Sequence, residues 1–201
     1  MKIFLKGFCI SLLCLSLLGL LWFLVLQPGL TNGEAQALKE TYTQPLPGES
    51  SGELPAGKEQ PEPESLVALS ALQAEYPDIQ GWISIPGTCV DYPVLQSSAD
   101  DPEYYLRRTY KGEHRTAGSI FFQWDCSPES KNLVVYGHNM NDGTMFAVLQ
   151  KMADETFRKE HSQILLQTSD GLREYRIAAV LKTDIQKLPF NRTEFADNAD
   201  F

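Results

Sequence analysis

The chain has 201 residues, of which 43% are hydrophobic, and a formal net charge of −9 at pH 7. This length allows one ordinary domain with appendages, and the apolar fraction is sufficient for a packed core. The negative charge argues against nucleic acid or an anionic membrane surface as a partner. Residues 31–65 contain seven Glu and only two Lys, so we interpret this acidic segment as a solvated spacer and not as a binding surface.

The N-terminal segment has the pattern of a membrane anchor. Lys2 and Lys6 precede nineteen uncharged, mostly apolar residues at positions 8–26. Nineteen helical residues span about 28 Å, close to the hydrocarbon thickness of a bilayer. A cleaved signal peptide is the alternative, but a small-residue cleavage site occurs only at residues 35–37. We therefore predict that residues 1–30 hold an uncleaved single-pass helix, with a cytoplasmic N-terminus and the rest of the chain outside the cell membrane.

The next segment predicts a flexible extracytoplasmic stalk. Residues 31–64 mix Pro, Gly, Ser and Glu with few large apolar residues, and such a composition buries too little surface to offset its chain entropy. At Ser65 the pattern changes, because this residue can cap a helix with leucines at helical spacing that ends before Pro77. We assign residues 65–201 to the folded domain.

The folded domain is predicted to be mainly β. Short runs rich in β-branched and aromatic residues predict strands at residues 82–85, 89–95, 119–122, 132–136, 163–168 and 174–183. The polar residues 100–115 are predicted to be helical or looped. Many short strands with only modest helices between them are typical of a β-barrel and not of a doubly wound parallel sheet.

The stretch NLVVYGHNMNDGTMF, residues 132–146, places a histidine at the end of a strand. Its apolar run stops at Gly137, and His138 follows immediately. Residues 139–144 are turn formers, and an apolar pattern at helical spacing begins at Met145. The segment therefore predicts a strand, a histidine, a turn and a helix in this order.

The stretch YGHNMNDGTMFAVL closely resembles the histidine segment of class B sortases, the membrane-anchored cysteine transpeptidases of Gram-positive bacteria. The resemblance extends upstream through PDIQGWISIPGT, VDYPVLQ, YYLRRTY and GSIFF, and downstream through FRKEHSQILLQT and EYRIAAVL, over about residues 66–184. It implies a closed eight-stranded sortase barrel with short helices, of which this chain lacks the final strands. It also implies a thiol enzyme that cleaves the C-terminal sorting signal of a surface protein. Through a thioester, such an enzyme joins that protein to a peptidoglycan amine or, in some relatives, to a pilin subunit.

The resemblance assigns the acid–base role in this reaction to His138. Histidine suits the role because its ordinary pKa of about 6.5 lets it give and take a proton at physiological pH. From the residue pattern alone, a structural histidine at a strand end is the alternative. Class B sortases carry, further along the chain, a nucleophilic cysteine on a strand and then an arginine, and neither motif occurs in these 201 residues.

We therefore expect a fragment or a truncated product that has no transpeptidase activity as it stands. The alternative is a non-catalytic, surface-anchored barrel that binds a sorting peptide or a partner protein.

The remaining histidines and cysteines predict no second site. His114 lies in a charged loop and His161 is expected to interact with free carbonyls at a helix end. Cys89 is expected to be a buried, inert thiol, and a strand of about five residues separates Cys126 from His138 by roughly 16 Å. A Cys89–Cys126 disulfide is a weak hypothesis that rests on an oxidising exterior. Without CxxC, HExxH, a calcium loop or a phosphate-binding glycine loop, we expect neither a metal nor a cofactor.

Overall fold

The structure is a computed structural model, and it describes residues 2–22, 27–45 and 65–196. Its α-helices are α1 (Lys2–Leu21), α2 (Gln27–Tyr42), α3 (Leu69–Glu75) and α4 (Glu155–Glu160), and two longer 3₁₀ helices are η2 (Tyr104–Arg107) and η3 (Phe146–Ala153). Its strands are β1 (Thr43–Pro45), β2 (Ser65–Val67), β3 (Ile79–Ser84), β4 (Asp91–Gln96), β5 (Ile120–Phe122), β6 (Val135–Tyr136), β7 (Gln163–Thr168) and β8 (Gly171–Arg176).

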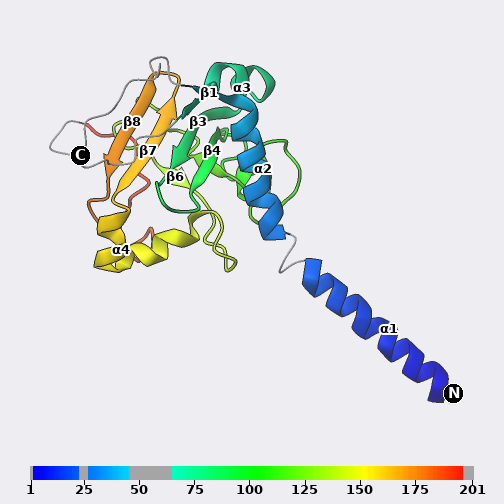
Figure 1. The fold of residues 1–201 in the computed structure, drawn as a ribbon. Coiled ribbons are helices and arrows are strands. Elements are labelled where there is room, and N and C mark those ends of the chain that lie inside the picture. Colours follow the sequence, from blue (N-terminus) through cyan, green and yellow to red (C-terminus); the bar gives the residue numbers. More distant parts are fainter. Residues whose placement is uncertain (1, 23–26, 46–64, 197–201) are drawn as a thin grey trace, which may run out of the picture.

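Six of these strands form one curled sheet with the order β6-β5-β4-β3-β7-β8 (Figure 1). Strands β4 and β5 run parallel, and all other neighbours in this sheet are antiparallel. The prediction of a mainly β, sortase-type sheet with short helices is confirmed. In the described residues the sheet is open, because β6 and β8 form its two edges and do not pair with each other.

The strand predictions were accurate for β7 and less so elsewhere, since buried β3 begins at Ile79 and not at the predicted residue 82. Strand β7 matches the predicted residues 163–168, whereas β8 begins and ends earlier than the predicted residues 174–183. Gly171 explains the difference, since its φ of 122° lets the chain reverse at once into a tight β7–β8 hairpin. Strand β8 is mostly exposed, so no buried face marked its ends in the sequence.

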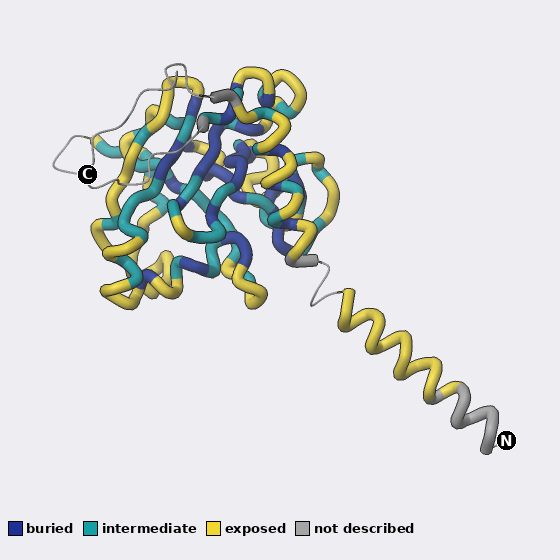
Figure 2. The backbone as a smooth tube through the Cα atoms, in the orientation of Figure 1, coloured by how far each residue is buried: buried dark blue, intermediate teal, exposed yellow. Residues whose placement is uncertain are grey.

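Both faces of the sheet are covered, because neighbouring side chains along a strand point to opposite faces. Ile83 and Val94 belong to one apolar cluster, which includes buried side chains of η3, and Trp82 and Leu95 belong to the other, which includes buried side chains of α3. The buried residues therefore run through the middle of the sheet, between its exposed flanks (Figure 2).

Helix α2 replaces part of the predicted stalk. Ala35 and Leu38 are each only 6% exposed and belong to the two apolar clusters. The same helix makes ion pairs with strand β4 and with Arg115. The prediction of a flexible stalk over residues 31–64 is thus wrong for residues 31–45. The buried side chains of Ala35 and Leu38 and two ion pairs fix this segment, although its composition alone is typical of disorder. Residues 46–64 lie outside the described residues.

The predicted helix start at Ser65 is also wrong. Ser65 opens β2, which pairs with β1, and helix α3 begins only at Leu69. The residue before α3 is Ala68, and its side chain caps nothing. The helix is held instead by burial of Leu69 and Leu72, which are 5% and 0% exposed.

Helix α1 lies apart from the sheet in Figure 1, and its described side chains are exposed. No helix of the described residues has the length and apolar character needed to cross a membrane. The predicted anchor over residues 8–26 lies only partly within the described residues. The described helix contains both lysines and ends at Leu21, and residues 23–26 lie outside the described residues.

After β8 the chain forms turns and extended backbone up to residue 196. It returns to the connection between β5 and β6, where the Asn132 amide donates to the carbonyls of Phe190 and Arg192 at 2.9 and 2.7 Å. The Thr193 hydroxyl donates to Asp125 at 2.7 Å. These bonds place the end of the described chain beside the start of the histidine segment.

Candidate active site

His138 lies two residues after β6, which is an edge strand of the sheet in the described residues. Its Nε2 atom is 2.8 Å from the carbonyl oxygen of Leu106, in helix η2. Because a carbonyl oxygen only accepts, Nε2 carries the hydrogen and donates it. In the neutral ring this leaves the lone pair on Nδ1, which has no hydrogen-bond partner among the described residues. The half-buried imidazole can therefore accept a proton at one defined atom.

Gly137 sets the path of the chain into the histidine. A Cβ atom at this position would lie 2.4 Å from Cδ1 of Ile120 and 2.6 Å from Cδ2 of Phe146. Both distances are shorter than real Cβ contacts, so any larger residue would push the backbone or its neighbours away. The absence of a side chain thus lets the strand end pack directly against β5 and the start of η3.

The loop after His138 closes on itself. The Phe146 amide donates to the carbonyl of His138 at 2.8 Å, and Asn139 and Met145 form an antiparallel bridge. Within the loop, one Asp142 oxygen accepts from both the amide and the hydroxyl of Thr144, at 2.9 and 2.6 Å. The predicted turn is confirmed, and the helix that follows is of the 3₁₀ type. Backbone contacts across the loop consequently fix the chain at His138 and at the residue that follows it.

The other two histidines are not brought to this site. His114 is exposed, as predicted, and pairs with Arg108 in an isolated bridge. His161 ends helix α4, but its Nδ1 atom lies 2.9 Å from the carbonyl of Pro86, in the β3–β4 connection. The prediction that it interacts with free helix carbonyls is thus wrong in its partner, because the ring turns toward the Pro86 carbonyl of a neighbouring segment. The ring also contacts Phe157, within α4 itself.

Cys89 and Cys126 do not act on His138. Cys89 donates its thiol hydrogen to the carbonyl of Gly143 at 3.2 Å, and buried Cys126 donates to that of Asn132 at 3.5 Å. Burial raises the pKa of both thiols, which disfavours the reactive thiolate. Both thiols are free, so the Cys89–Cys126 disulfide hypothesis is wrong: each sulfur bonds a different carbonyl. In the described part of the chain, no cluster of His, Cys, Asp or Glu has the arrangement of a metal site.

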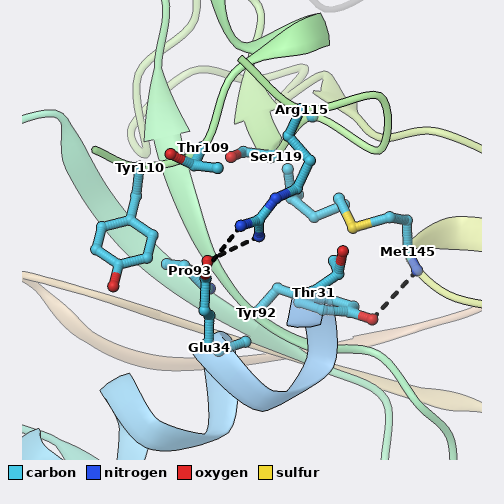
Figure 3. Close-up of a pocket in the computed structure, with 12 residues that line it drawn as sticks. Thr31, Glu34, Tyr92, Pro93, Thr109, Tyr110, Arg115, Ser119 and Met145 are labelled. Carbon is cyan, nitrogen blue, oxygen red and sulfur yellow. Dashed lines mark hydrogen bonds and ion pairs between the residues drawn. The ribbon is translucent and has the colours of Figure 1, made fainter. Parts of the chain in front are cut away.

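A second set of polar residues lies where α2 crosses the sheet (Figure 3). The Arg115 guanidinium donates to both carboxylate oxygens of Glu34, each at 2.7 Å. The hydrogen bond with Glu34 raises the pKa of Arg115, so the guanidinium stays charged. The pocket beside this pair has a volume of about 30 Å³, enough for one or two water molecules and too small for a peptide.

Sequence reasoning did not find four groups, which include the partners of the Tyr92 hydroxyl and of Arg115: the Leu106 carbonyl, Glu34, Asn32 and Tyr92. The Leu106 carbonyl is a backbone atom, and no residue type signals its role. Glu34 and Asn32 were assigned to the spacer because its composition resembles disorder. Tyr92 is buried in strand β4, where its hydroxyl needs hydrogen-bond partners, and no feature of the sequence identifies them.

Comparisons with known proteins agree with this arrangement. The sortase domain family matches residues 83–199, which is more than half of the chain. Sortase B of Listeria monocytogenes is 40% identical over 135 residues, covering 66% of this chain and 54% of that protein. Sortase B of Staphylococcus aureus is 36% identical over 128 residues, covering 62% of this chain and 50% of that protein. The chain thus spans about half the length of the curated relatives it matches.

A solved complex of S. aureus sortase B with a substrate superposes with a TM-score of 0.61 and 32% sequence identity, covering 66% of this chain and 61% of the other. The family match over residues 83–199 contains strands β4 to β8, the strand end that carries His138 and the closed loop behind it. From the family match, the two relatives and this superposition, the chain belongs to the sortase family and is a class B sortase.

Proposed function

We propose that His138 is the acid–base residue of a cysteine transpeptidase that joins sorting-signal proteins to an amine at the cell surface. The observation that supports this proposal is the geometry of the ring. The Leu106 carbonyl occupies the Nε2 hydrogen, and Nδ1 remains available to accept and return a proton.

The proposed reaction has two steps. A thiolate attacks the threonyl carbonyl of the sorting signal, a thioester forms, the peptide bond breaks, and protonated His138 gives its proton to the leaving amine. An amine of a peptidoglycan precursor, or of a pilin subunit, then attacks the thioester. His138 takes a proton from this amine while the thiolate leaves, so the enzyme returns to its starting state.

The thiolate in this proposal is neither Cys89 nor Cys126. Burial raises the pKa of Cys89 and Cys126, and their hydrogens are directed at carbonyls away from His138. We therefore propose that the 201 residues contribute the acid–base half of the site and are inactive without a further thiol. We expect the purified chain to leave a sorting-signal peptide uncleaved in the presence of an amine acceptor, as followed by mass spectrometry. Cleavage that disappears in His138→Ala would contradict this part of the proposal.

The proposed substrate is a surface protein with a C-terminal sorting signal. A substrate complex has been solved for the S. aureus sortase B, and this supports the same class of substrate here. This substrate does not bind in the small pocket under α2, because the pocket volume of about 30 Å³ excludes a peptide.

The decisive experiment replaces His138 by Ala in the chromosomal gene of the source bacterium, because the proposal requires a further thiol that only the cell can supply. Muramidase then releases the wall-linked proteins, and the sorting-signal protein is quantified by immunoblotting. We expect its amount to fall by about 100-fold or more, because an acid–base residue typically contributes this much to the rate. The matched control is His114→Ala, which removes an exposed imidazole and should change nothing. An unchanged amount in His138→Ala would contradict the proposed role and favour the non-catalytic alternative.

A further inference from the structure

Tyr92 connects helix α2 to the loop that carries His138. This strand β4 residue is 4% exposed. Its hydroxyl donates to Oδ1 of Asn32, on α2, at 2.5 Å and accepts the amide hydrogen of Met145 at 3.1 Å. Figure 3 shows the ring reaching past α2 toward Met145. One hydroxyl thus bonds two segments that lie far apart in the sequence.

Met145 is the residue at which this link should have the greatest effect. It has a φ of 55°, and it is the only residue other than glycine with a positive φ in the described chain. Such a conformation persists only where the surroundings hold it. Met145 is 2% exposed, so its amide has no access to water and needs a protein acceptor. The Tyr92 hydroxyl is that acceptor.

The strained residue is joined to the histidine by short backbone contacts. Met145 forms the antiparallel bridge with Asn139, the residue directly after His138. The next amide, that of Phe146, donates to the His138 carbonyl at 2.8 Å. A change in the Met145 peptide therefore moves the His138 backbone, and with it the imidazole relative to the Leu106 carbonyl.

We propose that Tyr92 is a positioning residue for His138, and that α2 supports it by holding Asn32 against the hydroxyl. This inference builds on the proposed acid–base role of His138, but its structural part does not depend on that role. Burial raises the pKa of Tyr92 to about 12, so the hydroxyl keeps the hydrogen that it donates to Asn32 at physiological pH. The ion pair between Glu34 and Arg115 anchors the helix one turn or less from Asn32.

If Tyr92 had only a structural role, we would expect a different result. Loss of its hydroxyl would lower the free energy of unfolding and speed amide exchange throughout the sheet. A positioning tyrosine predicts a local effect, confined to residues 138–146 and to the ring of His138.

The experiment measures amide hydrogen exchange and histidine ring resonances by NMR in the full chain. In Tyr92→Phe we expect the Met145 amide to exchange about tenfold faster, because its acceptor is lost. The His138 ring resonances should shift, while those of His114 and His161 serve as internal references. The matched control is Tyr136→Phe, which removes a hydroxyl bonded to Gln123 and should leave Met145 exchange unchanged.

Asn32→Ala is the second variant, since it keeps the tyrosine and alters only a half-buried residue of α2. We expect faster exchange of the Met145 amide and shifted His138 ring resonances, both by less than in Tyr92→Phe. If Tyr92→Phe does not fold, Asn32→Ala alone tests the proposal. Met145 exchange and His138 resonances that match the wild type in the folded variants would overturn the proposal, as would changes spread evenly over the sheet. In cells, Tyr92→Phe should reduce wall-linked protein less than His138→Ala does. If His138→Ala had no effect, the proposed function would fail while the exchange result would still stand.

Discussion

The ion pair between Glu34 and Arg115 gives the sharpest test of how α2 is held. The Arg115 side chain is 13% exposed and that of Glu34 is 35% exposed, and both carboxylate oxygens accept from the guanidinium at 2.7 Å. At an effective dielectric constant of about 20, unit charges about 4 Å apart attract by roughly 4 kcal/mol. Desolvation of the two groups offsets part of this attraction. We therefore expect a coupling free energy of about 2 kcal/mol.

The two single variants should differ, because their remaining partners differ in exposure. Glu34→Ala leaves a nearly buried guanidinium without its carboxylate and should lower the free energy of unfolding by about 3 kcal/mol. Arg115→Met keeps the apolar stem and leaves a carboxylate that water can reach, so we expect a loss of about 1 to 2 kcal/mol. The double variant should be more stable than the sum of the single losses implies.

Urea unfolding of the full chain, followed by the fluorescence of buried Trp82, measures all three variants. The matched control is Lys39→Met, which breaks the second ion pair of α2. That pair is more exposed, at 30% and 32%, and Asp91 retains a hydrogen bond from Trp82 at 2.7 Å. We expect a loss below about 1 kcal/mol there. Strictly additive losses for Glu34→Ala and Arg115→Met would refute the reasoning, since they would show that the two charges do not interact.

Three further predictions concern the site and its surroundings. Gly137→Ala should lower the free energy of unfolding by about 1 to 3 kcal/mol, because the new methyl group overlaps two packed side chains. If the variant unfolded in urea like the wild type, these side chains would have moved aside without a loss of stability. Cys89 and Cys126 should react with iodoacetamide at pH 8 more slowly than a solvent-exposed thiol does, because burial raises their pKa. A disulfide-linked peptide that joins the two in the digest would contradict the structure. The pKa of Tyr92 is raised from 10.0 to about 12, so its contribution to stability is complete below pH 10 and is lost as the pH rises toward 12. Alkaline unfolding should therefore show a weaker pH dependence in Tyr92→Phe, and an unchanged dependence would contradict this assignment.

The sequence predicted those parts of the fold whose signal is local. The run before Gly137, the turn formers after His138 and the apolar runs of β4 and β7 each identify an element within a few residues, and the structure contains all of them. A buried strand has an apolar pattern that requires no knowledge of its neighbours. The exposed strand β8 lacks such a pattern, and its predicted ends were displaced.

The parts that could not be predicted depend on contacts between distant segments. Glu34 meets Arg115 across 81 residues, and Lys39 meets Asp91 across 52. Neither pairing leaves a trace in the composition of residues 31–45, which resembles a solvated linker. The sequence also cannot identify the Leu106 carbonyl that orients His138, since every residue has a carbonyl.

The placement of His138 follows from three independent constraints. The close packing at Gly137 fixes where the strand ends, the Leu106 carbonyl fixes one ring nitrogen, and the Tyr92 hydroxyl holds the loop behind the histidine. All three are supplied by residues 32–146, and none involves a thiol. The imidazole is therefore preorganised by groups that include no thiol, so its ring geometry can be measured in the 201-residue chain itself. If the histidine ring resonances showed several conformations in exchange, the three constraints would be too weak to position the imidazole, and the nucleophile would have to supply the missing order.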